Sequence, residues 1–273
     1  MKVFAYHEHD SFLHRLNPLT KLAYAVLIIV ALTAIVDPIT PLVALLLTLL
    51  AIAILGRVSL LELLRTLLPF VVLSFGLIWT TMVFYVADPA SHPRVVTVIG
   101  PIALTDQGIA YGLVIFFRTL GFFAASLLFV LTTDPTDFVQ ALIQRLRVSY
   151  RFGYGAHAAY RFVPLFEGEF ATIRAAHRIR GVRDGGGVIA RGRQFIGYLV
   201  PLLAGGVRKA ERVALAMDAR GFGAYPDRTY YRRSTFGVRD VAFAIGTMVV
   251  YGGLLFTLHR LGWLGELVPP FWG

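Results

Sequence analysis

Five apolar runs limit what this chain can fold into more than any other feature. They span residues 22–36, 41–55, 67–86, 109–131 and 241–258. The last three are long enough, or nearly so, to cross a hydrocarbon core of about 30 Å as helices. The first two have 15 residues each, which cover only about 22 Å at a helical rise. They predict either a pair of short passes or a hairpin that enters the membrane and returns.

The composition agrees with a multi-pass membrane protein. Apolar residues make up 57% of the 273 and charged residues only 15%, which is too apolar for an ordinary soluble domain. The chain has no cysteine, so disulfides and cysteine-based metal or redox chemistry are excluded. His7, Glu8, His9 and Asp10 precede the first apolar run, which is the wrong order for a cleavable signal peptide. We expect insertion to rely on the apolar helices themselves.

Basic residues are concentrated in one block. Residues 132–240 hold 18 of the 26 Lys and Arg but only 9 of the 16 acidic residues. If the N-terminus is cytoplasmic and the first two runs are separate segments, 23 of the 26 basic residues face the cytoplasm, as the positive-inside rule requires. We therefore predict an N-terminal membrane region at 1–131 with four apolar segments, a cytoplasmic domain at 132–240, and a C-terminal transmembrane helix and tail at 241–273.

Local signals refine this plan. Residues 95–104 alternate β-forming residues around Gly100-Pro101 and predict a small hairpin. Gly108 and Gly112 form a GxxxG pattern, which indicates either close helix packing or chance in a glycine-rich chain. Residues 133–137 (TDPTD) are a helix-start signal.

Two long helices are expected within the basic block. They should span residues 156–180 and 189–220, with bends near Pro164 and Pro201. A glycine run at 185–187 is the expected flexible joint between them. The same run is an ordinary loop if the two helices do not move.

Both of these helices are predicted to end in the same way. Residues 175–181 (AAHRIRG) and 215–221 (LAMDARG) each finish in Arg-Gly. Arginine favours the negative end of a helix dipole and glycine supplies a left-handed cap, so one such ending needs no function. Two copies in one basic block suggest more, because Arg180 and Arg220 would each present a guanidinium suited to carboxylates of a partner.

At these endings the sequence resembles a known family. It is similar to the transmembrane coupling component, or T component, of energy-coupling factor transporters, a group of ABC importers that includes the cobalt-type permeases. That family has Ala-Arg-Gly at the ends of two cytoplasmic coupling helices, and Ile179 here stands where alanine is usual in the first copy. Segments 10–21, 132–135 and 160–164 also resemble the family in order and spacing. The residues that match are Arg178, Ile179, Arg180 and Gly181 (motif 1) and Ala219, Arg220 and Gly221 (motif 2).

The resemblance implies an all-α integral membrane protein with about five transmembrane helices and a cytoplasmic domain of long coupling helices. It implies a non-catalytic subunit in the cell membrane whose motifs contact two ABC-type ATPase subunits, either a homodimer or a heterodimer. A separate substrate-binding membrane subunit, the S component, would hold the micronutrient, a vitamin or a transition-metal ion. The chain itself would need no cofactor, since ATP would be bound by the partner subunits.

Several other chemistries find little support in the sequence. None of Lys2, Lys21 and Lys209 follows a glycine, so the phosphate-binding lysine of a P-loop is missing. Residues 7–10 (HEHD) could hold a metal ion, but a solvated loop is the preferred interpretation, and we predict no metal site. Aromatic residues are sparse around the two motifs, which argues against nucleic-acid binding and leaves contact with the lipid bilayer as the plain alternative.

Arg118 is the one basic residue well inside an apolar run. An ionisable group at such a depth is by default a functional hypothesis. We expect it to be a structural anchor toward the cytoplasmic block or the S component, with snorkelling to an interface as the alternative. The runner-up function is a membrane-embedded enzyme or a stand-alone permease, although the apolar runs hold no pair of acid and base groups. A basic membrane-anchored binding module is a third reading.

Overall fold

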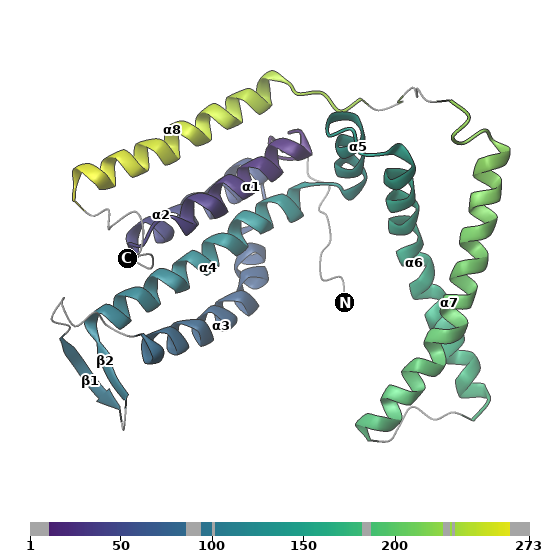
Figure 1. Cartoon of the computed structure of the whole chain (residues 1–273), viewed down its shortest axis with the longest axis horizontal. Helices are drawn as coiled ribbons and strands as arrows, with labels where there is room; N and C mark the ends of the chain where they lie inside the picture. The colour runs from purple at the N-terminus through teal and green to yellow at the C-terminus, as the bar shows by residue number, and fades with distance from the viewer. Residues whose placement is uncertain are drawn as a thin grey trace. The chain divides into compact units, whose positions relative to one another are not determined.

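The computed structural model describes residues 11–85, 94–99, 102–181, 187–225, 230 and 233–262. Within these residues the chain is almost entirely helical, which confirms the expected all-α class (Figure 1). The elements are α1 (Pro18–Thr33), α2 (Ile39–Gly56), α3 (Leu60–Phe84), β1 (Val95–Ile99), β2 (Ile102–Thr105), α4 (Asp106–Thr132), α5 (Pro135–Arg145), α6 (Tyr150–Ile179), α7 (Val188–Ala219) and α8 (Val238–Arg260).

Two compact units divide the chain. The first, here called the membrane unit, comprises Met1–Ala141 and Ser234–Gly273, and the second, the crossed-helix unit, comprises Leu142–Arg233. The helices α2, α3, α4 and α8 are long and apolar enough to cross a membrane, whereas α1 is apolar but has only 16 residues. All five apolar runs of the sequence are therefore helices of the membrane unit.

The core of the membrane unit lies where α1 and α2 pack on α4. Leu13, Ile52, Ala124 and Leu128 are fully buried there and Ile28 nearly so. The start of α1 coincides with a capping signal in the sequence. Asn17 caps α1 by accepting a hydrogen bond from the Leu19 amide at 3.0 Å, and Pro18 occupies the first turn.

The short helix α1 is tied to α4 at both of its ends. The Lys21 ammonium donates to the carbonyl of Thr132 at the last residue of α4, and the Arg118 guanidinium donates to the carbonyl of Ile35 just after α1. Because Arg118 lies near the middle of α4, α1 runs antiparallel to the C-terminal half of that helix. The turn between α1 and α2 therefore reaches only about halfway along α4.

The helices α3 and α4 approach closely at the GxxxG pattern. A Cβ on Gly112 would lie 2.7 Å from Cγ of Met82, and one on Gly108 would lie 3.2 Å from the Met82 carbonyl oxygen. Both glycines are buried, so the packing explanation for this pattern is confirmed and chance is not needed. The strands β1 and β2 form the expected antiparallel hairpin before α4, and its predicted turn, Gly100-Pro101, lies outside the described residues.

The helix α5 begins at the predicted start signal at 133–137. The Asp134 carboxylate accepts from the Thr136 amide at 2.6 Å, which confirms the signal.

The crossed-helix unit is built from α6 and α7. The predicted start of α6 at residue 156 was wrong, because the helix begins at Tyr150. The rings of Tyr150 and Tyr154 pack on Phe222 beyond the end of α7, so a contact distant in sequence holds this extra turn. Pro164 and Pro201 lie inside their helices as expected.

Contacts near the middle of the two helices define where they cross. A Cβ on Gly206 of α7 would lie 3.0 Å from the Phe166 ring of α6, so glycine permits a close approach. Glu169 of α6 and Lys209 of α7 form an ion pair beside this point. Tyr198 is almost fully buried and packs on Phe170, with ring centroids 5.8 Å apart. In the expected joint at 185–187, Gly187 caps α7, and Gly185 and Gly186 lie outside the described residues.

Candidate functional site

Motif 1 is the C-terminal cap of α6. The helix ends at Ile179, and Arg180 is the cap residue, whose amide donates to the Ala176 carbonyl at 3.2 Å. Gly181 follows with φ of +85° and donates to the Arg178 carbonyl at 3.0 Å. A side chain at Gly181 would be strained in this left-handed conformation. The glycine of motif 1 is thus explained by helix capping alone.

Motif 2 ends α7 in the same way. Ala219 is the last helical residue, Arg220 is the cap, and Gly221 has φ of +74°. The Phe222 amide reaches back to the Met217 carbonyl at 3.0 Å, which is the long bond of a Schellman cap. The predicted match between the two endings is confirmed as a match of backbone geometry.

The side chains of the motifs are left to solvent. Arg180 and Arg220 are exposed, and Ile179 is 89% exposed. Among the residues that the structure describes, neither of the two guanidinium groups has a hydrogen bond or an ion pair. Each can therefore donate a planar pair of N–H groups to a carboxylate of another molecule.

Each motif is supported by the other long helix. Beside motif 1, His177 of α6 packs edge-on against Tyr198 of α7, with ring centroids 5.0 Å apart. Beside motif 2, Phe222 packs on Tyr150 and Tyr154 of α6 at 5.7 and 5.6 Å. Figure 1 shows the consequence within this unit, where α6 and α7 cross and their C-terminal ends lie at opposite ends of the pair. Since α6 has 30 residues and is about 45 Å long, the two motifs are held far apart.

A further cation lies beside motif 2. The Arg151 guanidinium donates to the Tyr150 hydroxyl, which raises the pKa of Arg151, and it sits close to the backbone at Gly223. Arg151 therefore stays charged at any physiological pH. The end of α7 offers two positive charges to a partner, one from Arg220 and one from Arg151.

Arg118 has a different environment. It is half-buried in α4, and its guanidinium donates to the Ile35 carbonyl in the turn between α1 and α2. Its Nε is buried and has no hydrogen-bond partner among the described residues. The structure thus brings Arg118 to a backbone carbonyl of its own unit. The expected role as an anchor toward the cytoplasmic block or an S component stays a prediction.

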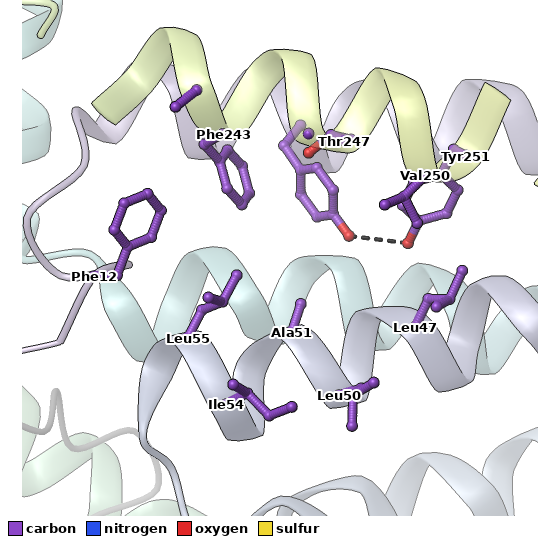
Figure 2. Close-up of a pocket in the computed structure, with 13 residues that line it drawn as sticks. Phe12, Leu47, Leu50, Ala51, Ile54, Leu55, Phe243, Thr247, Val250 and Tyr251 are labelled. Atoms are coloured by element: carbon purple, nitrogen blue, oxygen red, sulfur yellow. Dashed lines mark hydrogen bonds between the residues drawn. The ribbon is translucent and has the colours of Figure 1, made fainter. Parts of the chain in front are cut away.

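An apolar groove of about 410 Å³ lies between α2 and α8 of the membrane unit (Figure 2). Its polar content is a cluster of hydroxyls, in which Tyr251 contacts Tyr24 at 3.1 Å and Thr48 at 2.8 Å. No charged side chain is among the described residues that line it.

Sequence reasoning missed two sets of residues with structural roles. Asp240 at the start of α8 is buried and accepts hydrogen bonds from the first turn of α1, and its only sequence signal is an acid in the first turn of a helix. Gly205 and Gly206 mark the crossing of α6 and α7, and a glycine pair inside a helical pattern could have indicated it.

The metal candidate at residues 7–10 lies outside the described residues. Within the described ranges no group of three or more His, Cys, Asp or Glu side chains could hold a metal ion.

These observations define a class, namely a multi-pass helical membrane protein with a basic pair of crossed helices whose two ends present exposed arginines. Comparison with known proteins makes this specific. A family model described as "Cobalt transport protein" matches residues 9–231. The chain belongs to this family, the transmembrane components of energy-coupling factor transporters.

Individual relatives extend over almost the whole chain. The energy-coupling factor transporter transmembrane protein EcfT of Streptococcus thermophilus is 31% identical, covering 91% of this chain and 95% of the relative. The EcfT proteins of Staphylococcus aureus and Limosilactobacillus fermentum are 30% and 32% identical, covering 93% and 92% of this chain and 95% of each relative. The similarity therefore includes both the membrane unit and the crossed-helix unit.

Proposed function

We propose that this chain is the coupling subunit of an energy-coupling factor importer and that it links two ATPase subunits to a substrate-binding membrane subunit. Motif 1 contacts one ATPase and motif 2 contacts the other. The chain catalyses no reaction itself, and ATP is bound and hydrolysed by the partners. The transported substrate is a micronutrient, either a vitamin or a transition-metal ion.

The observation that carries this proposal is the pair of matched helix ends. Two exposed guanidinium groups at opposite ends of one crossed pair suit two separate binding grooves better than one. Each end is fixed by aromatic contacts from the other helix. A displacement of one ATPase relative to the other would therefore change the angle or position of the whole pair.

A stripe of exposed apolar side chains on α7 supports a further partner. Ile196, Val200, Leu203 and Val207 recur at helical spacing, and each is at least 59% exposed. A contiguous apolar surface of this kind on an extramembrane helix marks an interaction site. We assign it to the S component, with the surface of the bilayer as the competing occupant.

The proposed topology follows from charge. The N-terminus and residues 132–240 lie in the cytoplasm because the basic residues of the chain gather there. The membrane regions are then 1–131 and 241–273. Labelling of single introduced cysteines from either side of the membrane tests this topology, and labelling of the 132–240 region from outside would contradict it.

The proposed ATPase contacts are tested by charge reversal at the two helix ends. Arg180→Glu combined with Arg220→Glu should abolish co-purification of the two ATPases while the chain still inserts in the membrane, because a carboxylate in a partner groove would repel the new acids. The matched control is Arg161→Glu with Arg208→Glu, which changes one exposed arginine on each helix away from the ends. Unchanged ATPase recovery with both motif substitutions, or an equal loss in the control, would refute the proposed contacts.

A further inference from the structure

The crossed-helix unit is joined to the membrane unit by two stretches of chain. The outgoing stretch leaves α4 after Thr132 and continues into α5, and the returning stretch runs from Ser234 to the start of α8. Both stretches meet the first turn of α1. The polar side chains at this place are here called the junction, and they are Asn17, Thr20, Lys21, Thr132, Ser234, Thr235 and Asp240.

Lys21 holds the outgoing stretch. Its side chain is 1% exposed, and its ammonium donates to the Thr132 carbonyl, the last of α4. The carboxylates of Asp137 in α5 and Asp240 in α8 both interact electrostatically with this ammonium. A buried cation thus ties α1 to the end of α4, at the point where the chain leaves the membrane unit.

Asn17 holds the returning stretch. Its side-chain amide donates to the Ser234 hydroxyl at 2.9 Å and to the Thr235 carbonyl at 3.4 Å. Its side-chain oxygen meanwhile caps α1 at the Leu19 amide. One asparagine therefore fixes both the start of α1 and the chain that returns from the crossed-helix unit.

Asp240 closes the junction. Asp240 is buried, and one of its carboxylate oxygens accepts from the backbone amide of Asn17 at 2.7 Å and from the Thr20 hydroxyl at 3.0 Å. The other oxygen accepts from the Gly237 amide at 2.8 Å, in the returning stretch itself. A buried carboxylate that accepts three hydrogen bonds from α1 and from the returning stretch resists displacement, because each lost bond would leave a buried polar atom without a partner.

We infer that the junction is a rigid clamp through which the first turn of α1 positions both connections to the crossed-helix unit. This inference rests on the proposed coupling function and assigns Asn17, Lys21 and Asp240 as positioning residues. Movement of the connections is then passed to α1, and through it to α2 and α4, instead of being absorbed by loose linkers. The clamp stays closed throughout the transport cycle.

The first test loosens the clamp without unfolding α1. Asn17→Ser keeps a good capping residue but is too short to reach Ser234, and Ser234→Ala removes the same bond from the other side. In the complete complex reconstituted in vesicles, each should shift the equilibrium between closed and open clamp about fivefold toward the open form, as expected for one hydrogen bond, and substrate transported per ATP hydrolysed should fall. The matched control is Ser126→Ala, since the Ser126 hydroxyl is exposed and bonds only within its own helix.

The second test locks the clamp. The chain has no cysteine, so Asn17→Cys with Ser234→Cys introduces a single pair of thiols that a short bifunctional thiol reagent can bridge. Bridging should leave transport per ATP at the level of the unsubstituted chain, and the unbridged pair should lower it as Asn17→Ser does. A protein that needs this junction to open would instead lose transport on bridging, and that result would overturn the inference.

The outcomes separate the inference from the proposed function. If the unmodified chain retains no ATPase subunits, the proposed function fails and the clamp has nothing to transmit. If the ATPases are retained but Asn17→Ser and Ser234→Ala transport as much per ATP as Ser126→Ala, the clamp alone is refuted.

Discussion

The two units of the molecule differ in how each is stabilised internally. In the membrane unit, α1, α2 and α4 share a continuous core, and buried polar bonds fix both ends of α1. In the crossed-helix unit, α6 and α7 meet at their crossing and at their supported ends, and most of their large apolar side chains are exposed. The first unit is stabilised by its own packing, whereas the second presents surfaces that its own fold does not use.

This difference indicates where function resides. A pair of long helices with little mutual burial gains stability mainly from what it binds. The membrane unit in contrast can hold its geometry while partners bind and dissociate. The two units should therefore respond very differently to the same kind of substitution, and the following predictions test that expectation from the largest effect to the smallest.

The sharpest contrast compares two lysines. Lys21→Met should destabilise the membrane unit by about 1–3 kcal/mol, because the buried Thr132 carbonyl loses its charged donor. Lys209→Met, which breaks the partly exposed ion pair with Glu169, should cost at most about 1 kcal/mol. Thermal unfolding of each variant in detergent measures both. Equal effects would show that the two units are stabilised alike.

A substitution of Arg118 tests how the C-terminal end of α1 is attached to α4. Arg118→Leu should cost about 1–3 kcal/mol, since the Ile35 carbonyl loses its donor inside the membrane unit. The thermal midpoint in detergent should fall, and complex assembly and transport should weaken with it. If assembly and transport stayed intact, an anchoring role for Arg118 would be ruled out.

Glycine-to-alanine substitutions should have opposite effects on stability in the two units. Gly112→Ala should cost about 1–2 kcal/mol, because the new methyl group meets Met82 and Ile78 of α3. Gly197→Ala in α7, where nothing lies within 4 Å of the new atom, should stabilise its helix by about 0.5–1 kcal/mol. Circular dichroism during heating gives both values. A loss at Gly197 would reveal a contact of α7 that the crossed pair alone does not explain.

The smallest effect concerns the hydroxyl cluster beside the apolar groove. Tyr251→Phe removes the bonds to Thr48 and Tyr24 but keeps the ring packing. The expected cost is about 1 kcal/mol, the usual net value of such a bond. Limited proteolysis at the ends of α8 should detect the weaker attachment, and a cleavage pattern unchanged from the parent chain would argue against it.

Local patterns in the sequence predicted most of the helices and both motifs. Apolar length indicated the membrane helices, and the Arg-Gly endings indicated the caps, because a cap depends on residues within one turn. The early start of α6 was missed because Phe222, far along the chain, holds its first turn. The partner of Arg118 was missed for the same reason, as a carbonyl 83 positions away leaves no mark in the sequence.

The functional residues also divide into those with a local sequence signal and those defined by contacts between distant residues. Arg180 and Arg220 could be proposed from sequence because they are repeated in matching contexts. Asp240 could not, because its importance depends on the first turn of α1 folding back onto it. Residues whose role is to join distant parts of a chain become visible only when the tertiary structure is known.

The turn between α1 and α2, which Arg118 holds halfway along α4, leaves α1 shorter than the helices around it. Along α3 and α4 the apolar surface is tall enough for a full membrane, whereas α1, with 16 residues, is only about 24 Å long. Lipids beside this short helix would have to compress or tilt, at a fraction of a kcal/mol for each ångström of mismatch. We therefore expect lipids with shorter tails to gather beside α1.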